Sequence, residues 1–371
     1  MKKILSIIGT RPEAIKMAPV IKQLEQHPNC FTSIVCVTGQ HREMLDQIMT
    51  IFDIKPDYNL DLMTKNQTLA NLTSILISKL DVIVRGCAPD YILAQGDTTT
   101  VMASALVAYY NRTQFGHIEA GLRTMKITSP FPEEANRRIA DVLTNHYFAP
   151  TLRAQENLLS ENIEKGKIHV TGNTVIDALH HASKKPYEWS NGPLKDIPHS
   201  RKLILVTVHR RESFGAGLQQ ICSAIQDISA QLIGEDYHIV FPVHLNPNVQ
   251  EPVYSMLSAQ PNISLLSPLD YLSMINLLKE TFIVLTDSGG IQEEAPSFGI
   301  PVLVMRDETE RPEGVELGVV KLVGSNKEDI VLEALNLITN EKTYTQMARP
   351  CNPYGDGESA KRIISILKND L

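Results

Sequence analysis

The chain has 371 residues, more than one hydrophobic core usually supports, so we expect two domains. Hydrophobic residues make up 43% of it and charged residues 21%, as in an ordinary globular protein. The formal net charge of -7 argues against a broad basic surface, and no apolar run reaches membrane-spanning length, so we expect no nucleic acid and no membrane as partners.

Short apolar runs alternate with longer helical patterns in the first half of the chain, which is typical of a parallel sheet covered by helices. The first run, K-K-I-L-S-I-I, is similar to the start of a signal peptide. Its apolar core is too short, however, and Arg11 and Glu13 follow at once, so we interpret it as a buried strand. The predicted strands are residues 3–8, 33–38, 91–94, 114–118, 146–148 and 168–170, with helices that include 14–26, 99–110 and 133–143.

The stretch 184–200 collects three prolines and a glycine without sustained periodicity, and we predict it as the domain linker. A second alternation follows, with strands at 202–208, 237–243, 263–265, 282–286 and 301–305. The pattern predicts an α/β fold of two Rossmann-like domains with parallel sheets, residues 1–185 and 200–357. The terminal helix, within 358–371, is expected to complete the first domain. We expect the ligand in the interdomain cleft, at the carboxyl ends of both sheets.

A phosphate site is predicted at residues 287–294, which read D-S-G-G-I-Q-E-E. They follow the predicted strand 282–286 and open a helical pattern that ends near Gly299. A strand that leads through glycines into a helix leaves the first-turn N–H groups free to hold an anion. Only glycine lets a phosphate approach the backbone that closely.

Three carboxylates are predicted on one rim of the first sheet. Asp97 lies in Q-G-D-T-T-T, Glu119 in G-H-I-E-A-G-L-R-T, and Glu133 in P-F-P-E-E-A-N-R-R. Crowded carboxylates raise one another's pKa toward the working range, which suits proton transfer. The alternative is a set of helix caps and surface ion pairs, and Asp97 alone would be the expected N-cap of a threonine-led helix.

Arg11 and Lys16 lie near the start of the first helix, where Thr10 and Glu13 have capping-box spacing. Cations at that end oppose the helix dipole, so we expect an anion to compensate them. The alternative is that Arg11 pairs with Glu13 or with a neighbouring loop.

His209 follows the first strand of the second domain and is followed by two arginines, and His244 follows the second strand. A histidine that faces a phosphate stays protonated, and it would stabilise a leaving diphosphate or donate a proton to it. The alternative, a hydrogen-bonded structural histidine, is the commoner role for a lone histidine at a strand end.

Signatures of metals and cofactors are lacking. The histidines are dispersed without H-x-x-x-H spacing, and the five cysteines are odd in number without a C-x-x-C pair. We therefore expect no metal, and free thiols in a reducing compartment, the cytoplasm. The chain also lacks G-x-x-x-x-G-K-[ST] and a first-strand G-x-G-x-x-G. We expect no cofactor, and a nucleotide sugar as the phosphate ligand.

Taken together, nine motifs resemble those of the non-hydrolysing UDP-N-acetylglucosamine 2-epimerases over essentially the full chain. They are G-T-R-P-E-A-I-K at Gly9, Q-G-D-T-T-T at Gln95, H-I-E-A-G-L-R-T at His117, P-F-P-E-E-A-N-R at Pro130, T-G-N-T-V-I-D at Thr171, H-R-R-E-S-F-G at His209, P-V-H-L-N-P-N-V at Pro242, D-S-G-G-I-Q-E-E-A-P at Asp287 and T-E-R-P-E at Thr309. One short motif would be weak, but nine in order are highly specific. The resemblance implies the glycosyltransferase type-B fold and an isomerase that converts UDP-GlcNAc into UDP-ManNAc, which supplies ManNAc for cell-surface polysaccharide.

The resemblance also implies a mechanism in which UDP is eliminated to give 2-acetamidoglucal and is added back after reprotonation from the other face. Matched position by position, the catalytic residues are Asp97, Glu119, Glu133 and His209. The substrate-binding residues are Ser288, Gly289 and Gly290 for the diphosphate, Glu294 for the ribose, and Arg11, Lys16 and Arg311 for the other nucleotide and phosphate contacts. Leu269 and Met274 are placed beside the uracil, where relatives commonly carry Gln and Phe. Which carboxylate is acid and which is base stays open.

Some bacterial relatives bind a second UDP-GlcNAc as an activator. Gln40, Glu134, Arg210 and His244 match that site, but Glu43 and Asn66 stand where those relatives carry Gln and Arg. We therefore hypothesise that activation is weakened or absent. The family further implies a homodimer. The rival functions are a UDP-sugar glycosyltransferase, a hydrolysing epimerase and a nucleotide-sugar sensor without catalysis.

Overall fold

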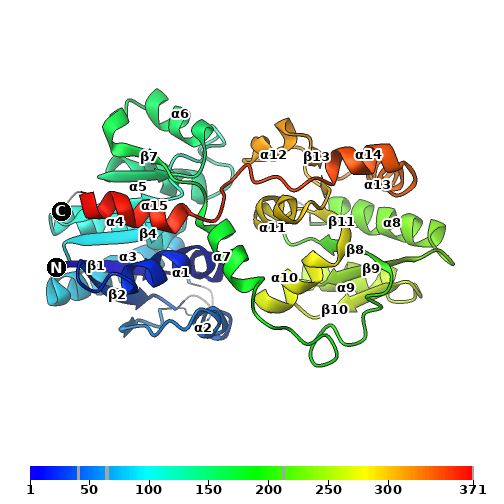
Figure 1. The fold of residues 1–371 in the computed structure, drawn as a ribbon, viewed down its shortest axis with the longest axis horizontal. Helices are drawn as coiled ribbons and strands as arrows, with labels where there is room; N and C mark the ends of the chain where they lie inside the picture. Colours follow the sequence, from blue (N-terminus) through cyan, green and yellow to red (C-terminus); the bar gives the residue numbers. More distant parts are fainter. Residues whose placement is uncertain (40–41, 63–66, 211–213, 370–371) are drawn as a thin grey trace. The chain divides into compact units, whose positions relative to one another are not determined.

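The computed structural model describes residues 1–39, 42–62, 67–210 and 214–369 (Figure 1). The chain forms two compact units, one of Met1–His181 with Tyr354–Leu371 and one of Ala182–Pro353. Each unit contains a parallel sheet, so the predicted α/β class with two parallel-sheet units is confirmed. Within the described ranges, no helix has both the length and the apolar character needed to cross a membrane.

The first unit has a seven-stranded sheet in the order β3-β2-β1-β4-β5-β6-β7. Its strands are β1 (Lys2–Ile8), β2 (Phe31–Val37), β3 (Tyr58–Asn59), β4 (Tyr91–Gln95), β5 (Gln114–Ile118), β6 (His146–Ala149) and β7 (Ile168–Val170), and all neighbours are parallel. The strand order reverses between β1 and β4, and open parallel sheets bind their ligands at the carboxyl ends of the strands at such a switch point.

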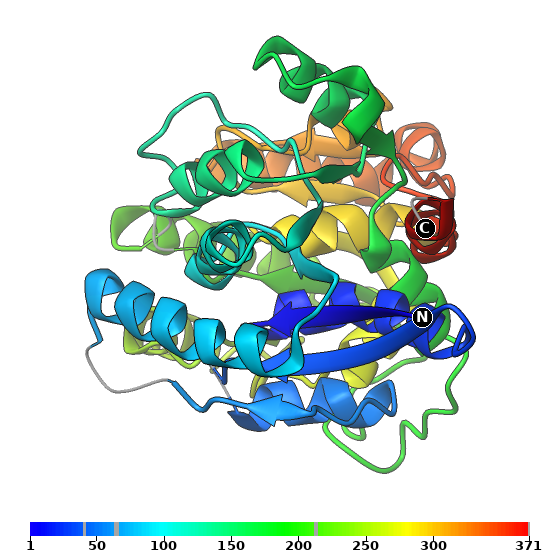
Figure 2. The ribbon, with the colours of Figure 1, turned by 90° about the vertical axis from the view of Figure 1, so that its left-hand side faces the viewer.

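Helices cover both faces of this sheet. They are α1 (Arg11–Glu25), α2 (Arg42–Ile51), α3 (Leu69–Cys87), α4 (Thr99–Tyr110), α5 (Glu133–Val142), α6 (Leu152–Ser160), α7 (Thr174–Ala182) and α15 (Ser359–Asn369), with a 3₁₀ turn η1 (Lys165–Lys167). Leucines of α3 and alanines of α4 pack against β1 and β4 on one face. Helix α15 packs against α1 on the opposite side (Figure 2).

Helix α15 is fixed to the first unit by Asp177 of α7. The carboxylate of Asp177 accepts the backbone N–H groups of Ser359 and Ala360, at 3.3 and 2.8 Å. This contact satisfies N–H groups that the first turn of a helix leaves unpaired. The contact anchors the C-terminal segment to the first unit.

The second unit has a six-stranded parallel sheet in the order β10-β9-β8-β11-β12-β13. Its strands are β8 (Lys202–Thr207), β9 (Tyr237–Pro242), β10 (Ile263–Leu266), β11 (Thr281–Thr286), β12 (Val302–Val304) and β13 (Val320–Leu322). Its helices are α8 (Ala216–Gln231), α9 (Pro247–Leu257), α10 (Tyr271–Lys279), α11 (Gly289–Glu294), α12 (Pro312–Glu316), α13 (Lys327–Thr339) and α14 (Glu341–Met347), with a 3₁₀ turn η3 (Ala295–Phe298). The switch point of this sheet lies between β8 and β11.

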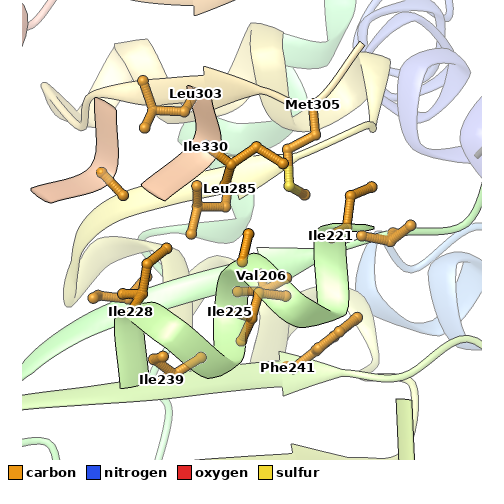
Figure 3. Close-up of a cluster of buried hydrophobic side chains, with 14 of the residues drawn as sticks. Val206, Ile221, Ile225, Ile228, Ile239, Phe241, Leu285, Leu303, Met305 and Ile330 are labelled. Atoms are coloured by element: carbon orange, nitrogen blue, oxygen red, sulfur yellow. The ribbon is translucent and has the colours of Figure 1, made fainter. Parts of the chain in front are cut away.

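The larger core of the second unit lies between its sheet and helices α8 and α13. Figure 3 shows side chains of α8, including Ile221, Ile225 and Ile228, beside Val206 of β8 and Leu285 of β11. All five are inaccessible to solvent. Because the sheet is covered on both faces, its strands are apolar along nearly their whole length, which is why the sequence predicts them well.

The predicted linker, residues 184–200, is instead part of the second unit. Leu194 and Ile197 are buried in a cluster with Leu203 and Leu205 of β8. Prolines and polar residues remove the helical periodicity, but two apolar side chains suffice to anchor the segment. The units divide after His181 and again after Pro353.

Candidate active site

The carboxylates of Asp97 and Glu119 follow neighbouring strands of the first unit. Gln95 at the end of β4 pairs with Ile118 at the end of β5, so both carboxylates come from the same edge of the sheet, beside the switch point. Arg137 Nη2 donates to Asp97 Oδ2 at 2.6 Å, and 29% of the Asp97 side chain is exposed. Asp97 therefore carries an oriented carboxylate that remains accessible.

Glu119 is held in a strained conformation. Its φ of 67° lies in the left-handed region, which costs a non-glycine residue about 1–3 kcal/mol and is found mostly at functional sites. The side chain is buried, and its Oε2 accepts hydrogen bonds from Lys16 Nζ and, at 2.8 Å, from Asn173 Nδ2. The structure thus joins Lys16, predicted as a phosphate contact, to a predicted catalytic carboxylate.

Helix α5 opens with Glu133 and Glu134, whose surroundings differ. Glu133 is half-buried, whereas Glu134 is inaccessible to solvent and accepts the Thr124 N–H at 3.1 Å and Arg137 Nη1 at 2.8 Å. Arg137 therefore connects Glu134 with Asp97. Burial lowers the pKa of Arg137, but the two carboxylates more than compensate and raise it, so the guanidinium keeps its charge. Glu134, predicted in an activator site, here positions the partner of Asp97.

The alternative interpretation of these acids as helix caps is wrong for two of them. The N-cap of α4 is Thr98 and that of α5 is Pro132, not Asp97 or Glu133. The ion-pair alternative is correct in part, since Asp97 pairs with Arg137. That pair is largely buried on the arginine side, and a pair of this kind orients the carboxylate more firmly than a surface pair does.

Glu13 forms the predicted capping box at the start of α1. Its carboxylate accepts the N–H of Gly9 at 2.5 Å, the N–H of Thr10 at 3.1 Å and the hydroxyl of Thr98 at 2.5 Å. Burial raises its pKa to about 7, against hydrogen bonds that lower it, and Asp97 contributes to the rise. Glu13 is therefore a buried acid whose proton is gained or lost near neutral pH.

We predict that Glu13→Gln removes a pH dependence of stability. A carboxyl whose pKa is higher in the folded than in the unfolded state binds more protons when the protein is folded, so the protein loses stability as pH rises. For Glu13, a rise from 4.5 to about 7 corresponds to a loss of about 2 kcal/mol between about pH 5 and pH 7. Gln keeps one acceptor oxygen for the backbone N–H groups and an amide for Thr98. Urea unfolding at pH 5 and at pH 7 measures the free energy of unfolding of both proteins. From pH 5 to pH 7 the wild type should lose about 2 kcal/mol relative to Glu13→Gln, and an equal change in the two proteins would contradict this ionisation.

In the second unit, the predicted phosphate site lies at the start of α11. Its N-cap, Ser288, makes no side-chain cap bond. The guanidinium of Arg311 lies against Gly289, because a Cβ built on this glycine would meet Arg311 Nη1 at 2.7 Å. Arg311 is itself paired with Glu293 and Glu310, each at 2.5 Å. A cation over a helix N-terminus adds to the positive potential there, so the arrangement suits an anion.

Asp287 supports the loop that carries His209. The carboxylate is inaccessible to solvent and accepts the N–H groups of His209 and Arg210, with distances of 2.9–3.1 Å, while His209 Nδ1 lies 3.1 Å from Oδ1. Burial would raise the pKa of Asp287, but the contacts with His209 and Arg210 outweigh it and lower the pKa. The imidazole of His209 is 41% exposed, so the loop presents an oriented, accessible histidine.

The other predicted site residues of the second unit differ in how far they are buried. His244 stacks on His209 with 6.2 Å between ring centroids, and burial together with His209 lowers the pKa of His244. Arg210 Nη2 donates to Glu310 at 3.2 Å. Leu269 is buried in the same apolar cluster against which the half-buried Met274 packs, and Tyr271 donates to Glu294 at 3.4 Å.

Three positions of the predicted activator site lie outside what the structure describes, namely Gln40, Asn66 and the side chain of Glu43.

Three residues that hold predicted site residues in place were missed in the sequence: Arg137 and Asn173 in the first unit, and Asp287 of the second unit in its role of holding His209. Arg137 stands three residues after Glu134 on a helix, a spacing at which side chains meet, so its contact could have been inferred. Asn173 and Asp287 act across long sequence separations and left no such signal.

Comparisons with known proteins show which family the chain is similar to. The family model described as UDP-N-acetylglucosamine 2-epimerase matches residues 22–368. Curated proteins of that name from Campylobacter jejuni and Escherichia coli (strain K12) are 49% and 48% identical, each over 99% of this chain and over 97% and 99% of their own length. The crystal structure of UDP-GlcNAc 2-epimerase from Neisseria meningitidis bound to UDP-GlcNAc superposes with a TM-score of 0.93 at 47% identity, covering 99% of this chain and all of that one. A Methanocaldococcus jannaschii enzyme in complex with UDP-GlcNAc and UDP gives 0.84 at 33% identity, with 99% of both chains covered.

Proposed function

The chain belongs to the UDP-N-acetylglucosamine 2-epimerase family, whose members are isomerases, and we propose that it interconverts UDP-GlcNAc and UDP-ManNAc without hydrolysis. The observation that carries the proposal is the delivery of Asp97 and Glu119 from neighbouring strands to one sheet edge. Each carboxylate is oriented there by a cation, Arg137 for Asp97 and Lys16 for Glu119. An epimerase that must remove and return a proton needs two such groups.

The proposed reaction is an elimination followed by an addition. The hydrogen at C2 of the sugar is not next to a carbonyl, so its simple removal and return would be very slow. A base takes this proton while the C1–O bond breaks, and UDP leaves with the bonding electrons as 2-acetamidoglucal forms. An acid then protonates C2 from the opposite face while a diphosphate oxygen of UDP bonds to C1 again. Atoms balance overall, and no redox cofactor is needed.

The carboxylates of the first unit supply the acid and base in this proposal, and most of the groups that stabilise UDP belong to the second unit. Asp97, Glu119 and Glu133 serve the two proton transfers. His209 stabilises the departing diphosphate or protonates it. The groups proposed to bind UDP are Ser288, the N–H groups of Gly289 and Gly290, the cations Arg311, Arg11 and Lys16, Glu294 at the ribose, and Leu269 and Met274 at the uracil.

The proposal is tested by proton NMR of UDP-GlcNAc with the protein in deuterated water. It predicts UDP-ManNAc as product and deuterium at C2 of both sugars. Free ManNAc with UDP would instead identify a hydrolysing epimerase. Transfer of GlcNAc to an acceptor would identify a glycosyltransferase, and tight binding without exchange a nucleotide-sugar sensor.

We predict that Gly289→Ala weakens UDP binding about 10-fold to 100-fold, the cost of a charge-assisted contact. The new Cβ would lie 2.7 Å from Arg311 Nη1 and displace the guanidinium. Gly86→Ala in α3 is the matched control, because a Cβ on this helical glycine outside the proposed site would meet nothing within 4 Å and it gains the same helix propensity. Isothermal titration calorimetry with UDP should separate the two variants; equal affinities would remove Arg311 from the phosphate site.

We also propose that UDP-GlcNAc activates this enzyme weakly or not at all, because Glu43 and Asn66 replace residues of the activator site. The rate with UDP-ManNAc as sole substrate should then rise hyperbolically. A sigmoidal curve abolished by traces of UDP-GlcNAc would contradict the proposal.

A homodimer and a role in supplying ManNAc for cell-surface polysaccharide complete the proposal. Helices α3, α4 and α5 pack side by side and expose apolar side chains that include Val82, Tyr109, Tyr110 and Val142. Such a surface suits a second copy of the chain, and sedimentation velocity measures the expected dimer. The five cysteines are free thiols, in keeping with the expected cytoplasmic compartment.

A further inference from the structure

His117 of β5 is inaccessible to solvent and faces a hydrogen-bond acceptor at each ring nitrogen. Nδ1 lies 2.6 Å from Asp141 Oδ1, and Nε2 lies 2.7 Å from the carbonyl oxygen of Gly96. A carbonyl oxygen only accepts hydrogen bonds, and so does an ionised carboxylate. Both nitrogens must therefore carry a hydrogen if both contacts are hydrogen bonds, and a neutral imidazole carries only one.

The charges around His117 balance only when it is protonated. Asp141 Oδ2 accepts Arg123 Nη2 at 2.6 Å, and Arg123 donates two further hydrogen bonds to Glu161, at 2.8 and 2.7 Å. The described contacts of this cluster thus join two carboxylates to one arginine and the imidazole. Burial lowers the pKa of His117, but the charge and hydrogen bond of Asp141 outweigh burial and Arg123 and raise it; the pKa of Asp141 is lowered in turn.

The Gly96 carbonyl connects this cluster to the candidate active site. Gly96 precedes Asp97 and has a φ of 91°, which few other residues adopt. Its N–H donates to the carbonyl oxygen of Ile118 at 3.0 Å and its own carbonyl accepts from His117, so β5 holds Gly96 through both of its backbone polar groups. Glu119 comes directly after the end of β5. The imidazole therefore links the turn that carries Asp97 to the strand that delivers Glu119.

We propose that His117 is a positioning residue that, as a doubly protonated imidazolium, fixes Asp97 relative to Glu119 through the carbonyl of Gly96. The catalytic consequence rests on the proposed function, in which both carboxylates transfer protons. The charge state of His117 does not depend on that function.

Two substitutions separate the contacts of the ring. In His117→Asn the amide nitrogen takes the place of Nδ1 and reaches only Asp141, whereas in His117→Gln it takes the place of Nε2 and reaches Gly96. We expect His117→Asn to lower kcat about 10-fold to 100-fold, with KM and UDP affinity within about twofold of wild type, and His117→Gln to restore most of kcat. Equal kcat values for the two variants would overturn the positioning role.

The charge state is measured on the wild-type protein, so the inference stays testable if a variant fails to fold. Nitrogen-15 NMR of labelled histidine, assigned by the signal lost in either His117→Gln or His117→Asn, should show both ring nitrogens protonated from about pH 6 to pH 8, although an ordinary histidine titrates near 6.5. A neutral ring in that range would overturn the inference even if epimerisation is found. Absence of epimerisation, with a doubly protonated ring, would defeat the proposed function and the catalytic role but not the charge state.

Discussion

Asp97→Asn should reduce deuterium incorporation at C2 of UDP-GlcNAc about 100-fold to 10,000-fold, the range over which a positioned acid or base contributes to catalysis. The substitution keeps the size of the side chain and an oxygen that can accept from Arg137, but it removes the carboxylate that would exchange a proton with the substrate. UDP affinity should change little, because the proposed diphosphate and base contacts of the second unit are untouched. The measurements are proton NMR in deuterated water and calorimetric titration with UDP.

A matched control is available at the opposite end of β4. Asp90→Asn makes the same chemical change just before the start of β4, where Asp90 accepts the N–H of Lys3 at 2.8 Å, whereas Asp97 follows the end of that strand. This variant should exchange at the wild-type rate. Glu119→Gln should resemble Asp97→Asn, and it also removes the carboxylate with which Lys16 forms an ion pair. If Asp97→Asn retained full exchange while folded, the assignment of proton transfer to this sheet edge would be wrong.

Much of the fold was predictable because the strands are buried on both faces. The strands predicted at 114–118 and 168–170 coincide with β5 and β7 to the residue. Strand β3, Tyr58–Asn59, escaped detection because two residues show no periodicity. The linker prediction failed at 184–200 because irregular backbone does not exclude burial, and two apolar side chains there were enough to join the core.

The candidate site was predictable where residues follow strands, since the carboxyl ends of parallel strands share one edge. Asp97, Glu119, His209 and Ser288 were found in this way. The buried hydrogen-bond partners of these residues were not predicted. A pair such as Glu119 and Asn173 joins distant parts of the chain and forms only in the folded structure. The position of a residue after a strand therefore predicts the sheet edge at which its side chain lies, whereas its hydrogen-bond partners depend on how the chain packs.

Asp287→Ala should destabilise the second unit by about 3–5 kcal/mol, the usual cost of removing one member of a buried charged network. The substitution leaves the backbone N–H groups of His209 and Arg210 without their acceptor and removes the partner of the His209 ring. Hydrogen exchange of peptides from β8 and β11 measures the loss, and peptides from β1 and β4 of the first unit serve as an internal reference. Exchange should rise in the former and stay unchanged in the latter.

Asp227→Ala is the matched control, because Asp227 also pairs with a cation of the second unit, Lys327 at 2.7 Å, but 45% of its side chain is exposed. An exposed pair contributes about 0–1 kcal/mol, so burial rather than charge pairing must explain any difference.

The pH dependence follows from the lowered pKa of Asp287. A carboxyl with a lowered folded pKa stabilises the protein above its unfolded value, near 3.9, and this stabilisation is lost as pH falls through the folded value. The difference between wild type and Asp287→Ala should therefore shrink on acidification. A difference that grew instead would mean that Asp287 is protonated in the folded protein and holds His209 by shape rather than by charge.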